Sequence, residues 1–272
     1  EKKMSITISR KELVIPNVSL HIISDNNKKI GVLKIPSFMP NSLCAETQNI
    51  IANKKIDSLV IDLRENGGGL IFQARCVASI FLGNQPMYNH HVPSKEMVET
   101  IDTPQMYFGN LTVLLNANSA SASELFAMAI ADNERGIILG ERSFGKASII
   151  AGNKIDENYS LMSVYDSFTS PISNYNHQGM GVTPQIELKQ NVMVSPKTIK
   201  READLEYFPI EFPGQSSVPF DLFLDFKIKD CASKIKEIVN PVEALDDDYL
   251  RTHLYFDTQL AQSILIMSEC YE

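Results

Sequence analysis

The stretch LTVLLNANSASASELFAMAIADNERGIILG, residues 111–140, decides the fold class of this chain. Its first part, LTVLLN (111–116), favours a strand, SELFAMAIADN (123–133) favours a helix, and GIILG (136–140) favours a second strand. Strand, helix and strand in this order indicate a βαβ unit, in which the helix packs on a sheet.

The same alternation extends toward the N-terminus. Residues 41–54 suit a helix, SLVIDLR (58–64) is typical of a buried strand, and LIFQARCVASIFL (70–82) suits a second helix. The Pro-, His- and Asn-bearing segment 84–110 predicts irregular structure. The expected fold class is therefore α/β, with a βαβ-type sheet core and helices packed on it.

Three regions differ in character. Residues 1–27 form a β-rich lead-in, and residues 28–190 carry the strand and helix alternation. From about Gln190 the sequence becomes acidic and rich in proline, and QLAQSILIM (259–267) suits a last helix. We expect residues 191–272 to form a C-terminal extension that packs on the core.

Composition excludes several classes of function. The formal net charge of −8 would repel a nucleic acid backbone. No apolar run approaches the ~20 residues that cross a bilayer, and the first ten residues lack the apolar stretch of a signal peptide. The four cysteines are scattered without a C-x-x-C pair, so they predict neither a zinc site nor a disulfide framework: Cys44, Cys76, Cys231 and Cys270.

NSASASELF is the first candidate for chemistry. Its small residues at a junction between strand and helix can hold a hydroxyl near the free amides of the helix, where a developing oxyanion is stabilised. The alternative is capping, because Ser119, Ser121 and Ser123 are all favoured at helix starts and Glu124 is favourable in a first turn.

Two further segments are ambiguous by themselves. GERSFGKAS (140–148) matches most of a phosphate-binding loop, but Ala147 replaces the required Ser or Thr and a strand follows, so a nucleotide site is excluded and Lys146 is left as a lone lysine. In DLRENGGG (62–69) the glycines either form a tight turn or bring an amide to an oxyanion hole.

Taken in order, IDLRENGGG, NSASASELFAMAIADN, GERSFGK and GVTPQIEL resemble the signature of the C-terminal processing peptidases, or tail-specific proteases, of peptidase family S41. The resemblance implies a ClpP/crotonase-like core and a Ser–Lys mechanism, with Ser121 as nucleophile and Lys146 as base. It also implies oxyanion donors at Ala122 and at Gly67 or Gly68.

A lysine base must be neutral, which burial away from carboxylates favours. We therefore expect Lys146 to be poorly exposed and within hydrogen-bond reach of the Ser121 hydroxyl. Glu124 and Asp132 are interpreted as supporting residues, with solvated or capping carboxylates as the alternative. Asp132 lies too far along the predicted helix to contact Ser121 or Lys146.

The sequence departs from the family pattern in three places. Ile150 stands where many members have Gln or Glu four residues after the lysine, which removes a partner for the amine. Only SITISRKEL (5–13) resembles part of the PDZ domain that many members carry, and most of 190–272 matches nothing in the family. These departures leave full activity and substrate selection open.

Two other functions compete with the Ser–Lys peptidase. A catalytically silent relative would bind a peptide or an apolar ligand, and retention of Ser121 and Lys146 argues against it. A Ser–His–Asp hydrolase would need a histidine base, and only His177 lies near the matched motifs among five candidates: His21, His90, His91, His177 and His253.

The resemblance also implies partners and location. The expected partners are protein or peptide substrates cut near apolar C-termini, with no cofactor, metal, nucleotide or nucleic acid, and a homo-oligomer is left open. The expected location is the cell envelope, periplasmic or secreted, although the chain itself shows no targeting segment.

Overall fold

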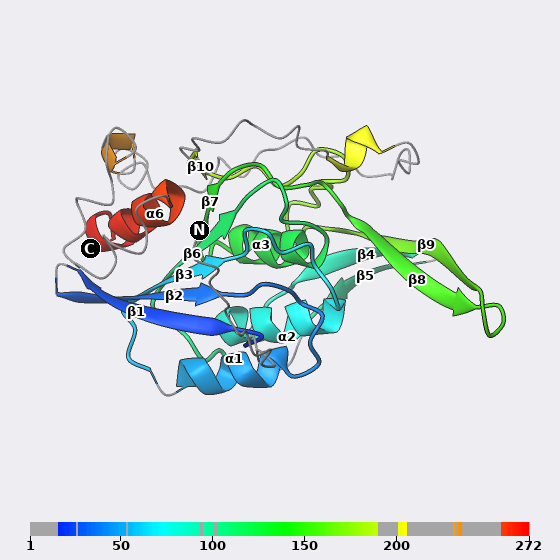
Figure 1. Cartoon of the computed structure of the whole chain (residues 1–272), viewed down its shortest axis with the longest axis horizontal. Coiled ribbons are helices and arrows are strands. Elements are labelled where there is room, and N and C mark those ends of the chain that lie inside the picture. Colours follow the sequence, from blue (N-terminus) through cyan, green and yellow to red (C-terminus); the bar gives the residue numbers. More distant parts are fainter. Residues whose placement is uncertain are drawn as a thin grey trace, which may run out of the picture.

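The computed structural model describes residues 16–25, 27–52, 54–92, 95–100, 103–189, 201–205, 231, 233–235 and 257–271. Strands and helices alternate through most of this part of the chain, so the predicted α/β fold is confirmed (Figure 1). The β-rich runs predicted before residue 16 and most of the C-terminal extension lie outside the described residues.

The central sheet has six strands in the order β1-β2-β3-β6-β7-β10. Its members are β1 (Ser19–Asp25), β2 (Lys28–Lys34), β3 (Ser58–Asp62), β6 (Asn110–Leu115), β7 (Ile137–Gly140) and β10 (Ile186–Glu187). β1 and β2 form an antiparallel hairpin, and the other strands continue the sheet in parallel. The carboxyl ends of β3, β6 and β7 therefore share one edge.

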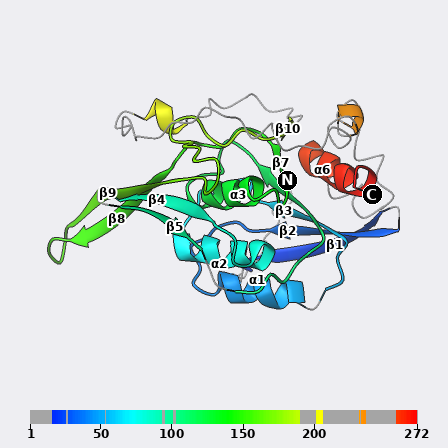
Figure 2. The same ribbon diagram turned by 180° about the vertical axis from the view of Figure 1, so that it is seen from behind.

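Helices cover both faces of this sheet (Figures 1 and 2). One face packs against α1 (Leu43–Ala52), α2 (Ile71–Leu82) and α3 (Ala122–Asp132), and the other against α6 (Thr258–Glu269). Successive side chains of a strand point to opposite faces, so Leu59 and Ile61 join the first core while Val60 joins the second. The predicted final helix is confirmed as α6. None of the helices that the structure describes could span a membrane.

A second sheet, in the order β5-β4-β9-β8, corrects one prediction. The segment 84–110 is not irregular throughout, because it contains β4 (Tyr88–Val92) and β5 (Lys95–Glu99). β4 pairs with β9 (Ser160–Thr169), so that Asn89 lies opposite Thr169. A strand fixed by a partner so distant in sequence carries a weak local signal.

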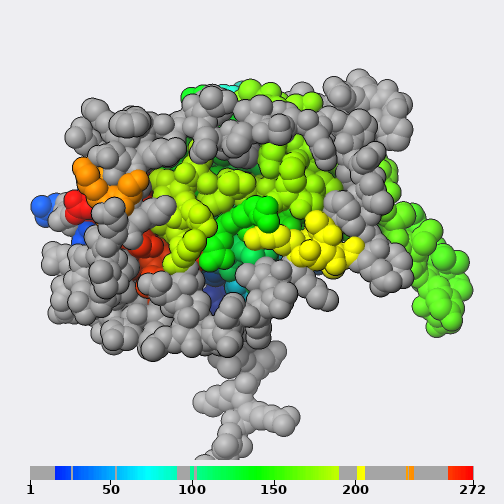
Figure 3. All heavy atoms as spheres, turned by 90° about the horizontal axis from the view of Figure 1, so that it is seen from above, coloured from blue at the N-terminus to red at the C-terminus, as the bar shows by residue number. Residues whose placement is uncertain are grey.

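β8 (Ser148–Lys154) and β9 form a hairpin arm that extends beyond the rest of the molecule (Figures 1 and 3). The arm begins two residues after Lys146, so it starts next to the segment that is predicted to carry the general base. Large apolar side chains are exposed along it: Ile150, Ile155, Tyr159, Leu161, Met162, Val164 and Tyr165.

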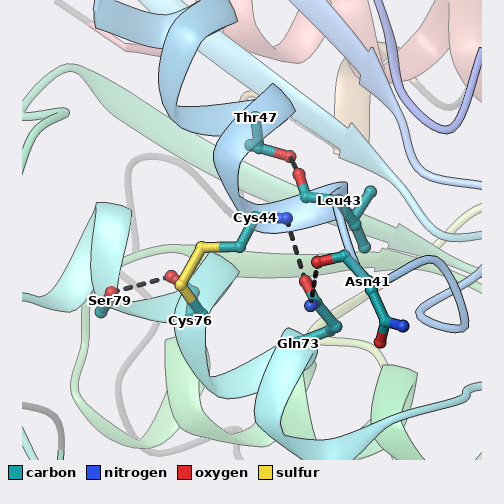
Figure 4. Close-up of a disulfide and its surroundings, with 7 residues drawn as sticks. All are labelled: Asn41, Leu43, Cys44, Thr47, Gln73, Cys76 and Ser79. Carbon is teal, nitrogen blue, oxygen red and sulfur yellow. Dashed lines mark hydrogen bonds between the residues drawn. A yellow bond between two sulfur atoms is a disulfide. The ribbon is translucent and has the colours of Figure 1, made fainter.

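All four cysteines are paired, which the sequence did not predict. A disulfide bond links Cys44 of α1 to Cys76 of α2 (Figure 4), and a second one links Cys231 to Cys270, the residue directly after α6. In the first pair, Gln73 braces the contact by accepting the Cys44 N–H at 3.0 Å and donating to the Asn41 carbonyl at 2.7 Å. Separations of 32 and 39 residues hide such pairs from any local motif.

Candidate active site

Three loops meet at the carboxyl edge of the parallel sheet. They follow β3, β6 and β7, which are neighbours in the sheet, and carry residues 63–69, 116–121 and 141–147. The Ala120 N–H donates to the Asn66 carbonyl, and the Phe144 N–H donates to the Ser119 carbonyl, each at 3.0 Å. The three sequence motifs are therefore in direct contact, at the edge where open parallel sheets bind ligands.

Ser121 directly precedes α3 and has a rare backbone conformation with positive φ, at φ of 56° and ψ of −115°. Non-glycine residues rarely adopt positive φ, and those that do cluster at functional sites. Both flanking serines are fully buried and donate to carbonyl oxygens, Ser119 to Leu63 at 2.9 Å and Ser123 to Asn66 at 2.8 Å. Ser121 is half-buried, so it is the accessible serine of the three.

The glycine turn packs against Ser121. Gly68 has a φ of 99°, and a Cβ there would lie 2.7 Å from the Ala120 carbonyl oxygen and 3.0 Å from the Ala122 nitrogen. Its own N–H donates to Asn66 Oδ1 at 2.9 Å. Within the described residues, the Gly67 and Ala122 amides donate no hydrogen bond, which leaves these two predicted donors available to a ligand.

Glu124 links the start of α3 to the loop that carries Lys146. It is fully buried, and its Oε1 accepts from Ser143 Oγ at 2.5 Å and the Gly145 N–H at 2.7 Å. Its Oε2 accepts the N–H groups of Ser121 at 2.8 Å and Lys146 at 2.7 Å. The interpretation of Glu124 as a solvated carboxylate is wrong, and the Ser121 contact makes capping only one part of what it does.

The side chain of Lys146 is half-buried at the same edge. In the part of the chain that the structure describes, its Nζ has no hydrogen bond and no carboxylate partner, so the expected bond to the Ser121 hydroxyl is not formed. Ile150, four residues further, is 42% exposed and offers no polar group to the amine.

His177 lies behind Glu124 rather than beside solvent. It is fully buried, its Nε2 is 3.6 Å from Glu124 Oε2, and its ring is 5.2 Å from that of Phe168. Both ring nitrogens lack a hydrogen-bond partner within the described residues. Sequence reasoning placed His177 near the motifs, and the structure brings it to the carboxylate that holds Ser121 in place.

Asp132 lies at the far end of α3 and does not contact Ser121 or Lys146, as its distance along the helix predicts. The interpretation of this carboxylate as solvated is wrong, because it is only 4% exposed. Its Oδ2 accepts the N–H groups of Ile172 at 2.5 Å and Ser173 at 2.9 Å, which fixes the turn after β9.

An ion network beside the glycine turn was missed by sequence reasoning. Arg64 donates through Nε and one terminal nitrogen to Asp62, at 2.9 and 2.8 Å, and through both terminal nitrogens to Asp257, at 2.6 and 2.8 Å. Lys34 completes the cluster at 3.1 Å from Asp62. The available signal was the DLR triplet at the end of a buried strand, where two opposite charges two residues apart need partners.

The network shifts the pKa values of its members. Burial alone raises the pKa of Asp62, but hydrogen bonds and charge attraction from Arg64, with the charge of Lys34, together lower it below the ordinary value. Burial likewise lowers the pKa of Arg64, and the hydrogen bonds to Asp257 and Asp62 raise it well above the usual range. Both groups are therefore charged at neutral pH.

No metal-binding cluster is present among the residues that the structure describes. No group of three or more His, Cys, Asp or Glu side chains there is arranged to hold an ion.

Comparison with known proteins matches residues 29–188 to peptidase family S41. The chain is 34% identical over 178 residues to the tail-specific protease of Haemophilus influenzae, covering 63% of this chain and 25% of the relative. It is 31% identical over 202 residues to the carboxy-terminal-processing protease of Bartonella bacilliformis, covering 70% of this chain and 45% of the relative. The chain thus spans between a quarter and a half of these relatives.

Among solved structures, the photosystem II D1 C-terminal processing protease is similar, with a TM-score of 0.60 and 25% sequence identity. The likeness covers 68% of this chain and 52% of that chain. A lipoprotein from Streptococcus agalactiae, at 15% identity and a TM-score of 0.56 over 64% of this chain and 66% of that chain, shares the fold.

Proposed function

The chain belongs to peptidase family S41, and from this premise we propose that it is a serine endopeptidase with Ser121 as nucleophile and Lys146 as general base. The observation that carries the proposal is the position of Glu124. Its buried carboxylate accepts hydrogen bonds from the backbone amides of both Ser121 and Lys146, at 2.8 and 2.7 Å, and so fixes the backbone of the proposed nucleophile and of the proposed base to the same side chain.

In the proposed reaction, the neutral Lys146 amine takes the proton of the Ser121 hydroxyl as its oxygen attacks the scissile carbonyl. The oxyanion that forms accepts hydrogen bonds from the Ala122 and Gly67 amides, which donate no hydrogen bond within the described residues. The lysine ammonium then protonates the leaving amine. Water then attacks the acyl-serine ester while Lys146 takes its proton, and the Lys146 ammonium returns this proton to the Ser121 oxygen as the second product leaves with a new carboxyl group.

Substrate and location extend this proposal. We propose that the substrates are proteins or peptides cut near apolar C-termini, as in the C-terminal processing peptidases that the motifs resemble. The two disulfides support a location in an oxidising compartment, either the cell envelope or outside the cell. The presence of the two disulfides is tested by treating the intact protein with a thiol-blocking reagent, with and without prior reduction, and measuring its mass. Four blocked thiols in the unreduced protein would contradict the proposal.

Cleavage of an unfolded protein such as casein tests the activity, with Ser121→Ala, Lys146→Ala and His177→Gln compared with the wild type. The proposal predicts that the first two variants lose cleavage and that His177→Gln keeps it. Loss in His177→Gln with retention in Lys146→Ala would favour a histidine base. No cleavage by a folded wild type, with no labelling of Ser121, would favour the catalytically silent relative.

A further inference from the structure

The first turn of α6 contacts two of the three loops of the candidate site. Asp257 and Gln259 lie almost two hundred residues after the glycine turn, yet both contact Arg64, which stands three residues before Gly67. Gln259 also contacts Glu141, which stands five residues before Lys146. The start of this helix therefore touches the chain leading to the predicted oxyanion donor and the chain leading to the predicted base.

The contact with the glycine loop has a fixed geometry. The Asp257 carboxylate accepts hydrogen bonds from both terminal nitrogens of Arg64, at 2.6 and 2.8 Å, and Gln259 Oε1 accepts one from the same guanidinium at 3.3 Å. Paired parallel bonds from a planar guanidinium to a carboxylate fix orientation as well as distance. Asp257 Oδ1 also accepts the Leu260 N–H at 3.1 Å, so the residue that caps the helix is the residue that holds Arg64.

The contact with the lysine loop comes from the other end of the Gln259 amide. Its Nε2 donates to Glu141 Oε1 at 3.0 Å and to the Leu188 carbonyl at 2.9 Å. Gln259 is 2% exposed and Arg64 8% exposed, whereas the Asp257 side chain is 29% exposed, so burial shields these bonds mainly on the side of Gln259 and Arg64. The strand order places β6, which leads to Ser121, between β3 and β7. A bridge from Arg64 to Glu141 therefore spans the loop of the nucleophile.

We infer that Asp257 and Gln259 are positioning residues of the active site, because they set the glycine turn against the Lys146 loop on either side of Ser121. The inference rests on the proposed function for its catalytic consequence. The helix itself is held by its apolar face on the sheet, through Leu260, Ala261, Ile264 and Leu265, and that packing is independent of the two polar contacts.

Two variants and one control test the inference. Asp257→Asn keeps an acceptor for the helix cap but loses the charge that holds Arg64. Gln259→Leu removes the hydrogen bonds to Arg64 and to Glu141 while keeping a similar side-chain volume. Ser263→Ala is the matched control, because its buried hydroxyl donates to the Gln259 carbonyl within α6 and contacts neither loop.

Steady-state cleavage of one peptide substrate gives the first readout. We expect kcat to fall roughly 10- to 100-fold in Asp257→Asn and Gln259→Leu, with KM changed less than about threefold, because small displacements of reacting groups are costly. Ser263→Ala should stay within about twofold of wild type. Equal losses in all three variants, or no loss in any, would overturn the inference.

Hydrogen exchange of the folded chain gives a second readout that needs no activity. Asp257→Asn should speed exchange of amides in residues 63–69, Gln259→Leu should speed it in residues 141–146, and Ser263→Ala should speed neither. A wild type that neither cleaves peptides nor labels at Ser121 would refute the proposed function alone, since the exchange result stands separately. Unchanged exchange in both loops would refute the positioning role while leaving the proposed function intact.

Discussion

Replacing Glu124 with glutamine removes one charge at constant shape from a buried position with four donors. Ser143 Oγ and the N–H groups of Gly145, Lys146 and Ser121 all lie within 2.8 Å of the carboxylate. A glutamine has one acceptor oxygen, and its amide hydrogens must face the donors on the other side. In the orientation that retains Ser143 and Gly145, the backbone N–H groups of Ser121 and Lys146 lose their acceptor.

The expected loss follows from these two amides. A buried donor left without a partner costs about 1–3 kcal/mol, and these two amides are part-buried, so together they lower the free energy of unfolding by roughly 2–4 kcal/mol, in the lower part of that range. Typical domains have about 5–15 kcal/mol of stability, so the variant should fold but unfold at lower urea concentration.

Urea unfolding at pH 7 measures the loss, with Glu187→Gln as control. Glu187 is an exposed carboxylate with only a 3.9 Å contact to Lys189, so its replacement should change stability by less than about 0.5 kcal/mol. A loss below about 1 kcal/mol in Glu124→Gln would refute the reasoning that this carboxylate holds the two loops together.

Three further perturbations have defined outcomes. Gly68→Ala should lower the free energy of unfolding by about 1–3 kcal/mol, because alanine is strained at this positive φ, and it should abolish labelling of Ser121 by a phosphonate. Gly67→Ala, whose Cβ would meet nothing within 4 Å, should leave the stability in urea unfolding near that of the wild type. The stability difference between wild type and Asp62→Asn should be full above pH ~3.9 and be lost as the pH falls through the lower folded pKa of Asp62, because in that window the unfolded chain binds a proton that the folded state does not. A difference that grows on acidification would contradict this. Double substitution of Cys44 and Cys76 by serine opens a loop with a separation of 32 residues and should cost about 3–4 kcal/mol, and a smaller change under oxidising conditions would argue that the pair contributes little.

The elements that sequence predicted well are those whose signal is local. The strand at 111–116 and the helix at 123–133 correspond to β6 and α3 within one residue or so, because apolar runs and their periodicity are set by neighbours in the chain. The three loops of the site follow from the same alternation, since parallel strands bring their carboxyl ends together.

The features that sequence did not predict depend on distant partners. Asn89 is in a strand because it lies opposite Thr169, and Arg64 is buried because Asp257 neutralises it. Glu124 was interpreted as a supporting residue, with a solvated or capping carboxylate as the alternative, because nothing near it in sequence reveals the four donors that surround it. A single sequence shows which residue types are present, but Asn, Arg and Glu also occur where no such long-range contact forms, so these contacts cannot be inferred from it.

Covalent labelling of Ser121 tests the central claim most directly. The folded wild type, Lys146→Ala and His177→Gln are incubated with a fluorophosphonate, and peptide mass spectrometry locates the adduct. The account predicts an adduct at Ser121 in the wild type and in His177→Gln, and its loss in Lys146→Ala. An adduct that survives in Lys146→Ala at the wild-type rate, or one on a different serine, would contradict the assignment of nucleophile and base.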